Sequence, residues 1–316
     1  MKPMIYITQR LPEEAIASLR ESYEIRMWED EMEAAPREEI MKHIGEAAAL
    51  WTMLSVKVDR EMFEAAPNLK IVSNLAVGFN NIDLDAAREH GVMVTNTPEV
   101  LTETTADLSF ALLLATARRL VEAERTVHSG EWKSWTPLGL TGQDVYGATL
   151  GIIGMGRIGE AVCRRAVGFS MDVLYHNRTR RNLEGATYAE LDELLEKSDF
   201  VLMLAPLTDE TRGMIGEREL GLMKETACLI NVGRGGTVDE DALYRALKEG
   251  GIWAAGMDVF ETEPLPLDNP LLTLPNFTAL PHIGSAGEKT RHKMMAMNAE
   301  AIDEGLKGNQ VKNRVC

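Results

Sequence analysis

The chain has 316 residues, more than one hydrophobic core usually accommodates, so we expect two domains. Hydrophobic residues make up 45% and charged residues 26%, as in an ordinary soluble globular protein. The formal net charge of −16 argues against nucleic acid and anionic membrane surfaces as partners, because both attract proteins rich in Lys and Arg.

The cysteines and the apolar runs indicate the cellular compartment in which the protein is expected. Cys163, Cys228 and Cys316 are odd in number and lack the spacing of a metal site. No apolar run approaches the roughly 18 residues that span a bilayer, and the first residues lead into an expected strand, not a signal peptide. We therefore expect a cytoplasmic protein in which Cys163 and Cys228 are core residues and Cys316 is exposed.

The first hundred residues alternate short apolar runs with helix-like segments. This alternation is typical of a parallel sheet covered by helices. Strands are expected at residues 3–8, 23–28, 48–54, 70–77 and 92–95, and helices at 12–21, 36–44, 59–66 and 82–90.

The segment 101–129 is long, apolar and rich in helix formers, and we predict one linker helix that opens a second unit. Residues 131–147 then form an irregular arm with Trp132, Trp135 and several Gly and Pro residues. Large aromatic side chains on such an arm indicate either a subunit contact, as in a homodimer, or an aromatic cluster that closes the domain's own core.

From residue 148 the alternation resumes and predicts a six-stranded, doubly wound sheet. A last helix at 285–307 is expected to return to the first domain. Strands are expected at 148–153, 171–176, 199–204, 226–232, 252–258 and 277–280, and the clearest helices at 160–168, 189–197 and 240–249.

A glycine motif lies between the first strand and the first helix of this second unit. Gly154, Gly156 and Gly159 have the G-x-G-x-x-G spacing of a dinucleotide-binding turn. The first glycine permits the tight turn, the second lets the backbone approach a pyrophosphate, and the third lets the helix pack close to the strand. The N-terminus of the helix would then face the phosphates.

Three polar residues follow strands of the same expected sheet. Arg234, Glu263 and His282 come just after strand ends, where ligands of open parallel sheets bind. Arginine offers a planar fork to a carboxylate, and histidine can exchange a proton near neutral pH. A neighbouring carboxylate favours the protonated imidazole, but the spacing alone does not choose between Glu263 and Glu261. Taken singly, Arg234 could be a surface charge and His282 a partly buried structural residue.

Several runs of the sequence together resemble the D-isomer-specific 2-hydroxyacid dehydrogenase family, and within it the glyoxylate/hydroxypyruvate reductases. The matching runs are 74–83, 151–159, 231–235, 256–260, 263–266 and 280–285, and they cover the chain nearly end to end. The resemblance implies an α/β fold of two doubly wound parallel-sheet domains. A Rossmann cofactor domain, residues 100–285, would be inserted into a flavodoxin-like substrate domain, residues 1–99 and 286–316.

The resemblance also implies roles for the three strand-end residues: Arg234 binds the substrate, His282 is the acid/base, and Glu263, not Glu261, pairs with it. Backbone N–H groups of the loop that contains Val77 and Gly78 would bind the substrate carboxylate. The family usually has an aspartate where this chain has Asn80, a difference that we interpret as structural. The residues expected to set the size of the pocket are Leu54, Ser55 and Trp135. In similar reductases this arm can approach the substrate pocket of the dimer partner, and Trp135 is the candidate for that contact.

The prediction of the cofactor depends on the second strand of the cofactor domain. NAD enzymes usually carry an acid there to bind the ribose 2′-hydroxyl, whereas this chain has Asn177 followed by Arg178 and Thr179. We predict NADPH, with NADH possible, because Arg178 and Thr179 could donate to a 2′-phosphate, assisted by Arg180 or Arg181; the alternative is a solvated basic loop. Further expected cofactor contacts are Thr105, Arg157, Ile158, Pro206, Val232, Asp258 and Gly284.

The expected activity is reduction of a small 2-keto acid, glyoxylate or hydroxypyruvate. Reduction of 2-ketogluconate or another longer 2-keto acid is an alternative of the same chemistry, decided by pocket size. A nucleotide-sensing protein that binds other proteins is an alternative of a different class, in which the three catalytic residues would have no role.

Overall fold

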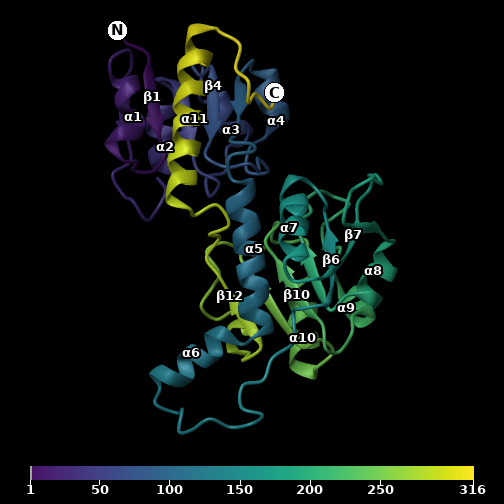
Figure 1. Cartoon of the computed structure of the whole chain (residues 1–316). Helices are drawn as coiled ribbons and strands as arrows, with labels where there is room; N and C mark the ends of the chain where they lie inside the picture. Colours follow the sequence, from purple (N-terminus) through teal and green to yellow (C-terminus); the bar gives the residue numbers. More distant parts are fainter. Residues whose placement is uncertain (1) are drawn as a thin grey trace. The chain divides into compact units, whose positions relative to one another are not determined.

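The computed structural model describes residues 2–316 and divides into two compact units (Figure 1). One unit contains the residues up to Leu101 together with Ala286–Cys316, and the other contains Thr102–Ser285. Both are built on parallel sheets covered by helices, so the expected α/β fold class, with one domain inserted into the other, is confirmed.

The first unit has a five-stranded parallel sheet with strand order β2-β1-β3-β4-β5. Its central strands are buried on both faces, which explains why β3 reads as the uninterrupted apolar run AAALWT. Helices α1 and α11 cover one face, where Trp51 is fully buried, and α2, α3 and α4 cover the other. The elements are β1 (Met4–Ile7), α1 (Glu13–Arg20), β2 (Glu24–Met27), α2 (Arg37–Ile44), β3 (Ala47–Thr52), α3 (Arg60–Glu64), β4 (Ile71–Asn74), α4 (Leu84–Glu89), β5 (Met93–Thr95) and α11 (Glu288–Lys307).

The second unit has a seven-stranded parallel sheet with strand order β12-β11-β10-β9-β6-β7-β8. The chain proceeds outward from β6 in one direction to β7 and β8, and in the other to β9 and beyond, which creates the switch point where such sheets bind nucleotides. Its elements are α5 (Thr102–Ala117), α6 (Leu120–His128), β6 (Thr149–Ile153), α7 (Arg157–Val167), β7 (Asp172–His176), β8 (Thr187–Tyr188), α8 (Leu191–Lys197), β9 (Phe200–Met203), α9 (Glu217–Leu222), β10 (Cys228–Asn231), α10 (Glu240–Glu249), β11 (Ala254–Met257), the 3₁₀ helix η1 (Pro270–Thr273) and β12 (Phe277–Ala279).

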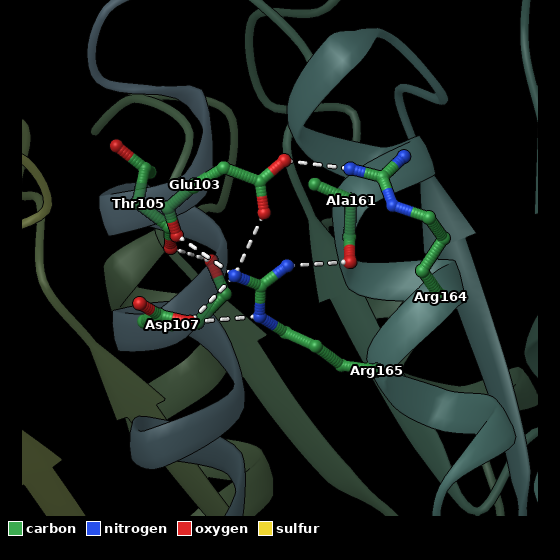
Figure 2. Close-up of polar contacts among 7 residues, drawn as sticks. Glu103, Thr105, Asp107, Ala161, Arg164 and Arg165 are labelled. Carbon is green, nitrogen blue, oxygen red and sulfur yellow. Dashed lines mark hydrogen bonds and ion pairs between the residues drawn. The ribbon is translucent and has the colours of Figure 1, made fainter.

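Helices α5 and α7 cover one face of this sheet, and α8, α9 and α10 cover the other. A polar cluster ties α5 to α7 (Figure 2). The Arg165 guanidinium donates to the Asp107 carboxylate at 2.5 Å, to the Glu103 carbonyl at 3.2 Å and to the Ala161 carbonyl at 2.8 Å. Because α7 begins at the glycine motif, this cluster fixes the helix whose N-terminus faces the expected phosphate site.

Three expectations about the elements are wrong in detail. The sheet has seven strands rather than six, because Thr187–Tyr188 pairs with β7. The segment 101–129 forms two helices, since Arg119 adopts the left-handed conformation (φ 54°) between α5 and α6. The last helix begins at Glu288, after the extended residue Gly287, rather than at 285.

Two general features complete the description. Within residues 2–316, no helix is long and apolar enough to cross a membrane, and no cluster of three or more His, Cys, Asp or Glu side chains could hold a metal ion. Cys163 and Cys228 are buried as expected, whereas Cys316 is half-buried rather than exposed.

Candidate active site

A histidine–carboxylate pair lies beyond the carboxyl ends of β11 and β12. His282 Nδ1 is 2.7 Å from Glu263 Oε2, and the other carboxylate oxygen accepts the Phe260 N–H at 2.9 Å. Each Glu263 oxygen therefore has its own donor, which fixes the carboxylate and, through it, the orientation of the imidazole. A carboxylate at Nδ1 leaves Nε2 as the nitrogen that can exchange a proton with a ligand.

The backbone at His282 is held in an unusual conformation. Its φ of 55° lies in the left-handed region, which is costly for a residue other than glycine. Asp258, fully buried at the end of β11, restrains it: the backbone carbonyl of Asp258 accepts the His282 N–H at 2.9 Å. Its two carboxylate oxygens accept the N–H groups of Ile283 and Gly284, both at 2.8 Å. Asp258 thus builds the loop that presents the imidazole.

The surroundings set the charge of the two carboxyl groups differently. Partial burial raises the pKa of Glu263, but His282, the Phe260 N–H and Arg234 together outweigh it and leave the pKa below its usual range. Burial raises the pKa of Asp258, and this effect prevails over the opposing Ile283 N–H, the charge of His282 and the Gly284 N–H. The contacts of Glu263 thus favour its negatively charged form next to the imidazole, whereas burial disfavours the charged form of Asp258.

The neighbouring acid, Glu261, does not face the histidine in this way. It is exposed, and its N–H donates to a carboxylate oxygen of Glu240 at 2.7 Å. The choice between Glu261 and Glu263, which spacing left open, is decided by this local geometry in favour of Glu263 as the partner of His282.

Arg234 follows β10 in a loop with little freedom. Asn231 Nδ2 and Thr237 Oγ1 both donate to the Arg234 carbonyl, at 3.1 and 2.7 Å. The backbone at Gly235 passes so close to Phe260 that a Cβ there would lie 1.8 Å from the Phe260 carbonyl oxygen. The arginine loop is thus held against the strand end that carries Glu263. Burial lowers the pKa of Arg234, opposed by the charge of Glu263, and the guanidinium remains positively charged.

The glycine motif has the geometry that a dinucleotide requires. Gly154 adopts a φ of 97°, and a Cβ there would lie 2.4 Å from the Ala205 backbone nitrogen, so only glycine fits the turn. At Gly156, which precedes α7, a Cβ would meet no atom of the described chain within 4 Å. The backbone therefore presents an open face at the start of the helix, which fits a pyrophosphate.

The end of β7 lies against this turn. Asn177 Oδ1 accepts the Met155 N–H at 2.7 Å, and its Nδ2 donates to the Met155 carbonyl at 3.0 Å. Arg181 donates to the same carbonyl at 3.0 Å and pairs with Glu160 at 2.5 Å. Asn177 therefore stabilises the glycine turn with both polar atoms, a function that its position in the sequence did not reveal.

The remaining basic residues of this segment are more exposed. Arg178 is 85% exposed and pairs with Glu210 at 3.4 Å, while the Arg180 guanidinium lies 5.2 Å from the centre of the Tyr188 ring. Thr179 lies between them in the same turn. Among the basic side chains of this segment, Arg178 is thus the one held most weakly by contacts with the rest of the protein.

The other expected cofactor contacts belong to the same region of the second unit. Four of them meet at Gly284, since a Cβ there would lie 3.4 Å from Asp258 Oδ2, 3.4 Å from Thr105 Cγ2 and 3.7 Å from Val232 Cγ1. Arg157 and Ile158 begin α7, and Pro206 is exposed after β9.

The expected substrate residues of the first unit follow two neighbouring strands. Leu54 and Ser55 come after β3, and Val77 and Gly78 come after β4. Asparagine side chains hold both loops, among them the buried Asn74, whose Nδ2 donates to the Gly78 carbonyl at 2.8 Å. These asparagines are not among the residues predicted from the sequence, although their concentration near strand ends was an available signal.

The arm 131–147 extends away from the sheet of the second unit (Figure 1). Trp132 is 65% exposed and Trp135 is 81% exposed, and Leu138 and Tyr146 are exposed as well. The alternative in which these aromatic side chains close the domain's own core is therefore wrong.

Comparisons with known proteins agree with this fold. The NAD-binding domain of D-isomer specific 2-hydroxyacid dehydrogenases matches residues 110–284. The chain therefore belongs to the D-isomer-specific 2-hydroxyacid dehydrogenases, oxidoreductases with a nicotinamide cofactor whose substrates are 2-keto and 2-hydroxy acids.

Particular relatives are similar over their whole length. A glyoxylate reductase from Korarchaeum cryptofilum is 50% identical over 321 residues, which cover 100% of this chain and 96% of that protein. A crystal structure from Thermus thermophilus superposes with a TM-score of 0.94 at 42% identity, covering 99% of this chain and 100% of that one. An NADPH-dependent glyoxylate/hydroxypyruvate reductase from Sinorhizobium meliloti, in complex with NADP and malonate, has a TM-score of 0.87 at 34% identity, covering 100% and 97%.

Proposed function

We propose that this protein reduces glyoxylate and hydroxypyruvate to the corresponding 2-hydroxy acids and prefers NADPH to NADH. The observation that carries the proposal is the His282–Glu263 pair at 2.7 Å, beside a half-buried arginine loop in the unit that also contains the glycine turn. The names of full-length relatives at about half identity support the choice of substrates.

In this proposal each residue has one task. A nicotinamide cofactor held by the glycine turn would supply the hydride for the carbonyl carbon of the 2-keto acid. His282 would donate the Nε2 proton to the carbonyl oxygen, so that hydride and proton together convert the carbonyl group into an alcohol. Glu263 stabilises the protonated imidazole before this transfer, and Arg234 binds and orients the substrate carboxylate with its guanidinium.

Residues at the end of β7 support the proposed preference for NADPH. A carboxylate at position 177 would repel a 2′-phosphate, whereas Asn177 carries no charge and uses both polar atoms on Met155. Arg178 is exposed and weakly paired, so it can turn to a phosphate with little loss of protein contacts. Thr179 adds a hydroxyl donor beside it.

We further propose that residues 1–99 and 286–316 bind the substrate and that residues 100–285 bind the cofactor. Leu54, Ser55, Val77 and Gly78 would contact the substrate from the first unit. The exposed aromatic side chains of the arm support a homodimer, in which Trp135 would approach the partner's substrate pocket.

A panel of 2-keto acids assayed with both reduced cofactors tests the proposal. We expect the highest kcat/KM for glyoxylate and hydroxypyruvate, and higher values with NADPH than with NADH. A preference for 2-ketogluconate would instead assign the longer-substrate activity. Tight NADPH binding without turnover of any 2-keto acid would instead indicate a nucleotide-sensing protein.

A further inference from the structure

The loop after β4 has carbonyl groups that are bound from the interior of the first unit. The Val77 carbonyl accepts a hydrogen bond from Asn96 Nδ2 at 2.8 Å, and the Gly78 carbonyl accepts one from Asn74 Nδ2 at 2.8 Å. Asn74 is fully buried and Asn96 is 8% exposed. Two buried side-chain amides thus determine which way two consecutive peptide groups face.

The orientation of the carbonyls fixes the orientation of the N–H groups. In a trans peptide the C=O and the following N–H point in opposite directions, so the N–H groups of Gly78 and Phe79 point away from the asparagines. The Ala76 carbonyl accepts the Thr97 N–H at 2.8 Å, which directs the Val77 N–H in the same way. Within residues 2–316, none of these three N–H groups donates to another residue. Consecutive outward N–H groups of this kind form an anion-binding concavity.

A third asparagine connects this loop to the loop after β3. Asn81 Nδ2 donates to the Val56 carbonyl at 2.9 Å and to the Met53 carbonyl at 3.3 Å. Its Oδ1 accepts from Asn74 Nδ2 at 3.1 Å. The two loops that carry the expected substrate residues of this unit are therefore joined through one pair of amides.

We propose that Asn74, Asn81 and Asn96 are positioning residues that hold the N–H groups of Val77, Gly78 and Phe79 in place for the carboxylate of the substrate. Because a carboxylate accepts bonds from several donors at once, a rotation of one peptide plane weakens its binding directly. This inference rests on the proposed function, since it requires a 2-keto acid as the ligand of the loop.

The test replaces Asn96 by alanine and measures two properties. The first is steady-state reduction of glyoxylate with NADPH, and the second is inhibition by oxalate, a carboxylate that cannot be reduced. Loss of a charge-assisted hydrogen bond should raise the KM for glyoxylate and the inhibition constant of oxalate by about 10–100-fold. The KM for NADPH and kcat should stay near the wild-type values, because the lost contact binds substrate equally before and during the reaction.

The matched control is Asn68→Ala. Asn68 Nδ2 also donates to a backbone carbonyl of the first unit, that of Gly45 at 2.9 Å, but in a different loop. This variant should bind glyoxylate and oxalate as the wild type does. If Asn96→Ala does not fold, Asn96→Ser retains a short donor and should show the same change to a smaller extent.

The possible results distinguish the positioning role of the asparagines from the proposed function. An unchanged inhibition constant for oxalate in folded Asn96→Ala or Asn96→Ser, with an active wild type, would overturn the positioning role and leave the proposed function standing. An equal rise in the KM for NADPH would indicate general distortion and also overturn it. A wild-type protein inactive toward every 2-keto acid would instead reject the proposed function, and this inference with it.

Discussion

The substitution Glu263→Gln tests whether the charge next to His282, and not only the shape of its partner, sustains the reaction. Glu263 accepts two hydrogen bonds, one on each oxygen, from His282 at 2.7 Å and from Phe260 at 2.9 Å. Glutamine has one acceptor and one donor, so it can satisfy only one of these donors. If its oxygen stays on Phe260, its NH₂ group faces the imidazole and favours the neutral form of the ring.

The expected loss follows from the kind of bond that disappears. A hydrogen bond to a charged group contributes about 1.5–3 kcal/mol and a neutral one about 0.5–1.5 kcal/mol. The difference of about 1–2 kcal/mol corresponds to a fall of about 5–30-fold in kcat/KM for glyoxylate at neutral pH.

Protein stability gives an independent measure of the same charge. The pKa of Glu263 in the folded protein lies below its ordinary value of 4.5, so its ionisation stabilises the fold above that pH. This contribution is lost as the pH falls through the folded-state pKa. Chemical denaturation at pH 7 should therefore show Glu263→Gln to be less stable than wild type, with a difference that shrinks below pH 4.5. Wild-type kcat/KM at neutral pH together with an unchanged pH dependence would refute the role of the charge.

The remaining predictions concern other parts of the second unit. Arg178→Ala should raise the KM for NADPH by about 10–100-fold and leave that for NADH unchanged; equal effects on both cofactors would exclude a 2′-phosphate contact. Arg165→Ala should lower the free energy of unfolding by about 1–3 kcal/mol, since it removes three partners on α5 and α7, whereas the exposed Arg164→Ala should cost less than about 1 kcal/mol. If denaturant titration gives equal losses for the two variants, the cluster does not stabilise the helix pair. A thiol reagent at pH 8 should modify only Cys316 in the native protein, because burial raises the pKa of Cys228 to about 12 and also raises that of Cys163; rapid modification of two or more thiols would contradict this burial.

The fold class was predictable because each unit repeats one simple pattern. Short apolar runs alternate with amphipathic helices, and parallel strands buried on both faces need no polar positions. The errors arose where a local conformation overrides the pattern. The left-handed backbone at Arg119 divides one apolar segment into two helices, and the two-residue strand Thr187–Tyr188 is too short to carry a periodicity.

The site residues that directly follow strands could be predicted from the sequence, because the strands themselves could be. Arg234 and His282 follow strands with clear apolar signals, and parallel topology places such ends on one edge of the sheet. What residue spacing alone could not provide is the assignment of hydrogen bonds. The choice of Glu263 over Glu261, and the use of Asn177 on the glycine turn, both depend on loop conformations that spacing does not encode.

The strained backbone at His282 explains why the site needs a buried carboxylate that never meets the reacting proton in the proposed mechanism. A left-handed residue followed by two inward N–H groups would be unfavourable without acceptors in the interior. Asp258 provides three acceptors at the end of β11, and their bonds to residues 282–284 offset the cost of that conformation. The same conformation brings the imidazole within 2.7 Å of Glu263.

The loop after β4 in the first unit is held by uncharged amides instead of a carboxylate. Asn74 and Asn96 bind the loop carbonyls, so that the N–H groups of the loop point outward. No negative charge is thereby placed on these groups where an anionic substrate is expected. If the loop after β4 binds the substrate carboxylate as proposed, the use of asparagines there and of Asp258 at the histidine loop matches the charge of the group next to each loop.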